Sequence, residues 1–297
     1  MPLPAFLIVC ALHGEAPLDS RAIMARLDAL ARARDWAGQA AYIEGLPPAN
    51  RLDLALNWAD ALVRSSQWAK LLALCDDPAL RGKDGRPLFP LRARAAALGG
   101  LGRYREAVVA YREMLKGGDI LAALSGWNAS LGAADWKAAE EFGSALAAKF
   151  PTSGEYVGMH GEALSRQGRF KEALVVLEKA AALSPRRAMT WADLGCCLNE
   201  AGRYQEAYDA ASKAVELDPR NMEGWQNRGR ACMGLKRYEE GRDHYAMALS
   251  LNPEDPAVAA NLRHNIAAAD AYLAYQARAK GPAKASAKAP SKGKPRS

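Results

Sequence analysis

Apolar residues recur at helical spacing through most of the chain, and the clearest example lies between residues 188 and 221. One apolar stripe precedes Gly202 and a second follows it, with Pro219 just beyond the second. Glycine suits the left-handed residue that ends a helix, and proline cannot continue one. The pattern therefore predicts two helices that face each other across a turn at Gly202. The stripe residues are Trp191, Leu194, Gly195 and Leu198, then Tyr204, Ala207, Ala211 and Ala214.

The same pattern recurs with a period of 34 residues. One helix pair cannot bury both of its stripes alone, so neighbouring pairs must stack. Gly195 removes a side chain where the two helices of a pair must approach closely. The period predicts an all-α solenoid of antiparallel helix pairs. The recurring positions are Pro151, Pro185, Pro219 and Pro253, then Trp136, Phe170, Tyr204 and Tyr238, and also Gly161, Gly195 and Gly229.

Residues 188–221 resemble the tetratricopeptide repeat, whose pattern is W-x2-L-G-x2-Y, then A-x3-F, then P. Leu198 stands where the family prefers Tyr, and Ala211 where it prefers Phe, so both positions remain apolar. The resemblance implies a right-handed superhelical solenoid with a concave groove lined by the first helix of each pair.

The template, applied outward, divides most of the chain into seven units. Residues 20–87 would form two degenerate repeat-like hairpins, or a plain helical hairpin domain, with an irregular loop at 76–87. Residues 88–255 would form five regular units, and 256–279 a capping helix that covers the last exposed stripe. The expected units are 20–51, 52–87, 88–120, 121–153, 154–187, 188–221 and 222–255, and the cap stripe is Val258, Leu262, Ile266, Ala269 and Leu273.

The net charge of +7 comes from the C-terminal end of the chain. Seven basic residues lie from Arg278 onward with no acid after them, which leaves 33 basic and 33 acidic residues before that point. Residues 280–297, rich in Lys, Ala and Pro, cannot support a core, so we expect a disordered tail. It would be a solvated tail or make a weak nonspecific contact with nucleic acid or an anionic membrane. No aromatic residue is interleaved with its charges.

The sequence carries no recognisable catalytic or metal-binding signature. Its five cysteines include the adjacent Cys196 and Cys197 but no pair of C-x-x-C motifs, and its four histidines share no ligand spacing. The paired cysteines and His160 are expected to pack in the fold. No P-loop, G-x-G-x-x-G, H-E-x-x-H or G-x-S-x-G motif occurs. We expect no enzymatic activity, no cofactor, no metal and no small-molecule substrate.

The N-terminal segment of residues 1–19 leaves the compartment open. Residues 3–12 are apolar apart from Pro4, like the centre of a signal peptide, but no Lys or Arg precedes them. Reduced thiols and this missing basic region favour the cytoplasm. The alternative is export or membrane anchoring through residues 3–12.

The resemblance implies that a peptide or helix of another protein lies in the concave groove. The groove positions predicted to contact it are Arg92, Ser125, Glu162, Arg166, Asn199, Gln226 and Arg230. One branch of the family holds a C-terminal carboxylate in a clamp of Lys, Asn and Arg. The corresponding stretch here does not reproduce that clamp, since it offers Gly158 and Glu162, then Asp193, then Glu223 and Asn227. We therefore expect a scaffold or assembly adaptor of bacterial type. The alternatives are a polyanion-associated protein acting through its tail and a periplasmic or membrane-delivered assembly subunit.

Overall fold

A computed structural model describes residues 20–77, 80, 91–251 and 254–280. Within these residues the secondary structure is helical, without strands, which confirms the predicted all-α class. The chain divides into two compact units, residues 1–151 and 152–297, which are described separately. No helix of the described residues is both long and apolar enough to span a bilayer.

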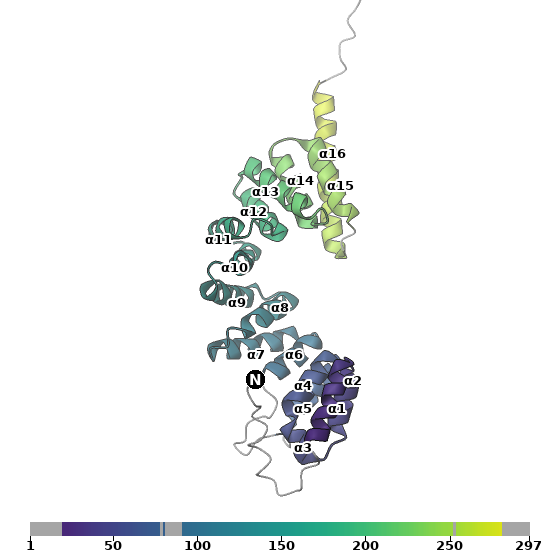
Figure 1. Cartoon of the computed structure of the whole chain (residues 1–297). Coiled ribbons are helices and arrows are strands. Elements are labelled where there is room, and N and C mark those ends of the chain that lie inside the picture. The colour runs from purple at the N-terminus through teal and green to yellow at the C-terminus, as the bar shows by residue number, and fades with distance from the viewer. Residues whose placement is uncertain (1–19, 78–79, 81–90, 252–253, 281–297) are drawn as a thin grey trace, which may run out of the picture. The chain divides into compact units, whose positions relative to one another are not determined.

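The first unit contains helices α1 to α9 (Figure 1). Their bounds are α1 Ser20–Arg32, α2 Trp36–Glu44, α3 Pro48–Asp53, α4 Ala55–Arg64, α5 Trp68–Asp76, α6 Leu91–Gly100, α7 Tyr104–Lys116, α8 Ala122–Ala133 and α9 Trp136–Lys149. The short α3 is not anticipated by the sequence and spans the expected junction between the first two units. Its start is explained by Pro48, since proline is favoured at the first position of a helix.

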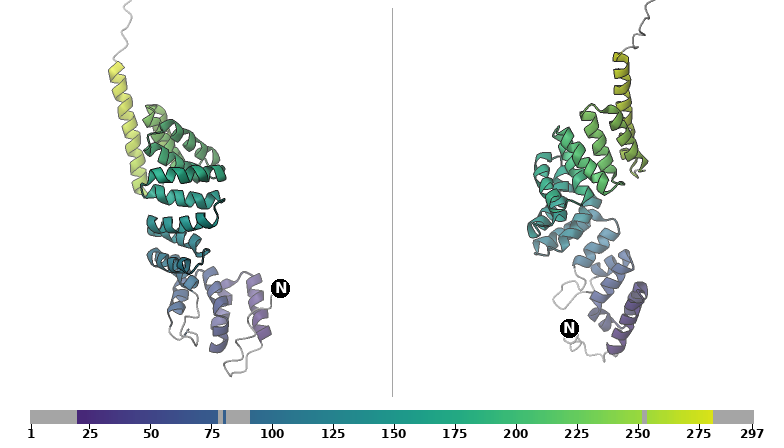
Figure 2. Two further views of the ribbon diagram at one scale, coloured as in Figure 1. Left: turned by 90° about the vertical axis from the view of Figure 1, so that its left-hand side faces the viewer. Right: turned by 45° about the horizontal axis from the view of Figure 1, so that its top comes forward.

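The second unit contains α10 to α16, which follow one another in layers (Figure 2). Their bounds are α10 Gly154–Arg166, α11 Phe170–Leu183, α12 Ala188–Glu200, α13 Tyr204–Leu217, α14 Met222–Gly234, α15 Tyr238–Ser250 and α16 Pro256–Lys280. Consecutive helices pack on each other, and α12 also contacts both α10 and α14. The first helices of successive pairs therefore lie side by side, as a repeat solenoid requires.

A residue in the left-handed conformation turns the chain between the two helices of a pair. Gly202 has a φ of +73°, which confirms the prediction from its position. Other pairs use a residue with a side chain at the same place, such as Ala134, whose φ is 51°, and Lys236, whose φ is 60°. The backbone geometry of the turn is thus kept even where the sequence lacks the glycine that favours it.

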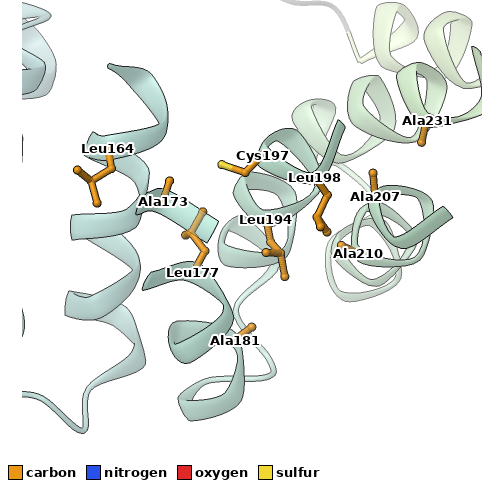
Figure 3. Close-up of a cluster of buried hydrophobic side chains, with 10 residues drawn as sticks. All are labelled: Leu164, Ala173, Leu177, Ala181, Leu194, Cys197, Leu198, Ala207, Ala210 and Ala231. Carbon is orange, nitrogen blue, oxygen red and sulfur yellow. The ribbon is translucent and has the colours of Figure 1, made fainter. Parts of the chain in front are cut away.

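The core of the second unit is built from small and branched apolar side chains of successive helices (Figure 3). Gly195 on α12 lies against the backbone of α13, because a Cβ added there would stand 3.4 Å from the Ala207 oxygen and the Ala211 nitrogen. The predicted close approach of the two helices is therefore confirmed. The buried cluster consists of Leu164, Ala173, Leu177, Ala181, Leu194, Cys197, Leu198, Ala207, Ala210 and Ala231.

The last helix, α16, closes the stack by packing on α15. Leu262 is fully buried against Tyr245 and Ala248, and the partly buried Val258 and Ile266 pack around them. The predicted capping helix is thus present. The segments expected to be a leader, residues 1–19, and a tail, residues 280–297, lie outside the described residues except for Lys280, as does most of the loop expected at 76–87.

Candidate binding groove

The second unit contains an open cavity of about 660 Å³. Its walls come from α10, α12 and α14, the first helices of three successive pairs, and from the capping helix α16. Polar and charged side chains dominate the lining, with a few apolar groups between them. The lining residues are Ser165, Arg166, Phe170, Asp193, Cys196, Glu223, Gln226, Asn227, Arg230, Met233, Tyr245, Asn261, Asn265 and Ala268.

Three of the predicted groove residues, Arg166, Gln226 and Arg230, line this cavity. Arg166 donates from Nη2 to Glu223 Oε1 at 2.6 Å, which links α10 to α14. Arg230 donates to Glu200 Oε1 at 2.5 Å, which links α14 to α12. Both arginines of the groove are therefore paired with a glutamate on another helix, so a partner would contact them as ion pairs.

Asn199 was predicted to contact a partner in the groove, but its side chain is buried between helices. Its side chain is 3% exposed, and Nδ2 donates to the backbone oxygen of Asn227 at 2.9 Å. In return, the Nδ2 of Asn227 donates to the backbone oxygen of Ala192 at 2.9 Å. The two amides tie α12 to α14, so Asn199 lies inside the helix interface rather than on the open surface.

The two predicted residues of the first unit make local contacts. Arg92 donates from Nη2 to Asp119 Oδ2 at 2.6 Å. Ser125 is half-buried on α8 and hydrogen-bonds with the side chain of Tyr111 on α7. Both contacts lie within the unit of residues 1–151.

A group of carboxylates faces the buried side of the cavity. Asp193 on α12 is 5% exposed, and its Oδ2 atom has no hydrogen-bond partner. Burial, reinforced by the negative charges of Glu162 and Glu223, raises the pKa of Asp193 well above the ordinary aspartate value. Burial likewise raises the pKa of Glu162, and Arg166 opposes that rise. The predicted residue Glu162 thus joins an acidic cluster rather than a simple solvated face.

The adjacent cysteines have the properties of packing residues. Cys197 lies in the core, where its thiol donates to Ser165 Oγ at 3.3 Å and burial raises its pKa to about 12. Cys196 lines the cavity, and burial raises its pKa as well. Because the thiolate is the nucleophilic and metal-binding form, these shifts make both thiols poorly reactive.

Possible metal-ligand atoms lie within 4.8 Å of one another at Cys232, Glu240 and His244. The spacing of these residues in the sequence did not suggest this grouping. Arg237, however, binds both carboxylate oxygens of Glu240. The positive charges of Arg228 and Arg237 also lower the pKa of His244, after the larger effect of burial. Two guanidinium groups at this point oppose the binding of a divalent cation.

Two features of the repeats were not predicted from the sequence. One residue at the same position of successive repeats lines the cavity, namely Asp193, Asn227 and Asn261, which are spaced by 34 residues. The period could therefore have predicted that these three residues share one face. An arginine also stands at the residue before α7, α11, α13 and α15, with a glutamate three positions later. An example is the Nε of Arg203, which donates to Glu206 Oε1 at 2.8 Å. The other pairs are Arg103 with Glu106, Arg169 with Glu172, and Arg237 with Glu240.

Comparison with known proteins agrees with the repeat pattern. Two family models described as tetratricopeptide repeat match residues 159–221 and 198–266. None of the curated proteins compared with the chain matches it.

Solved structures similar to the chain include the MamA protein, with 21% identity over 53% of this chain and 87% of that chain, at a TM-score of 0.46. YrrB, described as a tetratricopeptide-repeat protein with an unusual peptide-binding site, has 19% identity over 69% and 99% at 0.46. A thermophilic tetratricopeptide-repeat protein of Thermus thermophilus has 25% identity over 61% and 96%, also at 0.46. At these TM-scores the structural similarities add nothing to the family matches.

Proposed function

Because the chain is a tetratricopeptide-repeat protein, with repeats matched across residues 159–266, we propose that it is a non-catalytic scaffold for another protein. A peptide or a helix of the partner lies in the groove formed by α10, α12, α14 and α16. The observation that carries this proposal is the open cavity of about 660 Å³ lined by the first helices of successive repeats. Extended concave surfaces of this kind are the usual binding feature of solenoids.

The chemistry of the lining supports binding rather than catalysis. Arg166 and Arg230 are engaged in ion pairs, and the thiol of Cys196 has a raised pKa. Gln226, Asn261 and Asn265 offer amide groups that both donate and accept hydrogen bonds. Such groups match the backbone of a peptide, and the ion pairs add charge that selects its side chains.

Two further predictions belong to the same proposal. The first is that Arg92 and Ser125, which lie in the first unit, also contact the partner protein. The cytoplasm is the proposed compartment, supported by the odd number of cysteines and by the adjacent pair.

The proposal is tested by filling the groove at a position with room for a larger side chain. Gln226→Trp places an indole in the cavity, and Gln205→Trp makes the same change on the exposed face of the second helix α13. Each variant, immobilised, is used to capture proteins from a native lysate alongside the parent chain, and circular dichroism confirms equal helicity.

We expect Gln226→Trp to lose the specific partner and Gln205→Trp to retain it. The opposite result would place the binding site on the second-helix face. Equal capture by both variants would also contradict the groove.

A further inference from the structure

Asp193 differs in chemistry from the residue at the same position of the next repeat. Asn227, 34 residues later, uses its amide to donate to the backbone oxygen of Ala192 on α12 at 2.9 Å. An ionised carboxylate cannot donate such a bond. The Oδ2 atom of Asp193 instead lies buried without a partner in the wall of the cavity. A buried polar atom without a partner destabilises the fold, so a ligand group that reached Oδ2 would supply a hydrogen bond that the fold does not.

The surroundings of Asp193 carry an excess of negative charge. Glu162 and Arg166 face it from α10, Arg187 from the residue before α12, and Glu223 from α14. Arg166 is hydrogen-bonded to Glu223, and Arg187 donates to Thr190 Oγ1 at 3.3 Å. Three carboxylates thus stand against two guanidinium groups. When all three carboxylates are ionised, a single added cation would balance the cluster and provide the missing partner of Oδ2.

We propose that this acidic end of the groove binds the ammonium group of a lysine side chain, and that residues 281–297 of the chain itself supply it. This inference rests on the proposed function, in that the groove receives a peptide segment. The segment has five basic residues and no acidic one, and it follows directly on α16, which forms one wall of the cavity.

The segment is long enough to return to the cavity. From Ala268, which lines it, to Lys280 the helix runs 12 residues, or ~18 Å at the helical rise. Eight extended residues from Gly281 to Lys288 span ~26 Å, and the 12 to Lys292 span ~40 Å. Lysines from Lys288 onward can therefore return to the level of Ala268 in the cavity wall, whereas Lys284 lies too close to the end of α16 to do so.

Occupation by this segment regulates the proposed groove. The segment is attached to the same chain, so its local concentration is on the order of millimolar, as for a short linker. It competes with any external partner that enters the same end of the cavity. Binding of an ammonium group also favours the ionised form of Asp193, so affinity rises as the pH rises toward and through the raised pKa of this residue.

The test uses the full-length chain with Lys284, Lys288, Lys292, Lys294 and Arg296 replaced by glutamine, which removes the competing charges and keeps the length. The probe is a fluorescein-labelled synthetic peptide of residues 281–297, and binding is followed by anisotropy from pH 5 to pH 8. A peptide with glutamine at the same five positions is the ligand control. Asp193→Asn removes the buried charge, and Asp209→Asn removes an exposed charge on α13 as the matched protein control.

We expect the lysine peptide to bind, and Asp193→Asn to weaken it by ~10-fold or more, as for the loss of a buried charge partner. Asp209→Asn should change affinity less than about twofold, as for an exposed charge. The chain with its native tail should bind the peptide at least ~3-fold more weakly, because its own segment competes at millimolar local concentration. Affinity should rise with pH in the parent and much less in Asp193→Asn.

No binding of the peptide, or equal weakening by both substitutions, would overturn the inference. Its failure is distinct from failure of the proposed function. If the peptide does not bind but Gln226→Trp still abolishes partner capture, the groove remains the binding site and only its occupation by residues 281–297 is wrong. If capture survives Gln226→Trp while peptide binding depends on Asp193, the scaffold assignment of the groove is wrong.

Discussion

Replacing Gly195 by leucine tests the packing on which the whole second unit depends. The glycine lets α12 approach the backbone of α13, where an added Cβ would already stand 3.4 Å from the Ala207 oxygen and from the nitrogen and Cβ of Ala211. An alanine would therefore just fit. The three further carbons of leucine would meet backbone atoms that cannot rotate away as a side chain can.

Two opposing effects set the magnitude. Leucine gains ~0.8 kcal/mol over glycine in helix propensity. Overpacking of a filled interface costs ~1–3 kcal/mol and sometimes more. Gly99 on α6 supplies the matched control, because an added Cβ there has no neighbour within 4 Å. Gly99→Leu should therefore gain the propensity alone.

The assay is urea unfolding followed by far-UV circular dichroism on the parent and both variants. We expect Gly99→Leu to unfold at a slightly higher urea concentration than the parent and Gly195→Leu at a clearly lower one. Their unfolding free energies should differ by ~1–3 kcal/mol or more. A Gly195→Leu midpoint equal to or above that of Gly99→Leu would refute the close approach of α12 and α13.

Further predictions concern the turns, the buried acid and the buried thiol. Asp193→Asn should raise the urea midpoint at pH 8, because the raised pKa of Asp193 means that its ionised form destabilises the fold. Below pH ~3.9, the ordinary aspartate pKa, Asp193 is protonated in both the folded and the unfolded chain, so the substitution should have little effect. An equal difference at every pH would argue against the raised pKa. Gly202 has a positive φ, so Gly202→Ala should lower the unfolding free energy by ~1–2 kcal/mol. Ala134 also has a positive φ, so Ala134→Gly should stabilise the fold slightly, because relief of the backbone strain is partly offset by ~0.4–1 kcal/mol of backbone entropy. Urea midpoints that move in the same direction for both variants would contradict the role of the turn. Alkylation of Cys197 at pH 8, read by mass spectrometry, should be far slower in the folded chain than in urea, because its pKa is about 12 when buried; equal rates would disprove its burial.

The repeat architecture is predictable from the sequence because its causes are local. Gly202 at the turn, Gly195 at the close approach and Pro219 after the second helix each act within one helix pair, and the period repeats them. The capping helix follows from the same pattern, since Leu262 continues the apolar stripe and is buried. Each of these features needs only the spacing along the chain.

The details of the groove depend on neighbours that the spacing does not reveal. The sequence places Asn199 on the groove face of its own helix, but in the fold its amide is buried and donates to the backbone oxygen of Asn227 on α14. The raised pKa of Asp193 arises from its burial and from Glu162 and Glu223, which lie about one repeat before and after it along the chain. The left-handed turn at Lys236 could not be predicted from the sequence, because no glycine stands at that position.

The most direct test of the binding groove is hydrogen exchange of the full chain with and without a partner recovered by the parent chain. We expect partner binding to slow amide exchange in α12, α14 and the first half of α16, whose side chains line the cavity. Exchange in α13 and α15 should change little, apart from residues that face the cavity such as Tyr245. Protection confined to α13 and α15, with α12 and α14 unchanged, would contradict the groove as the site of binding.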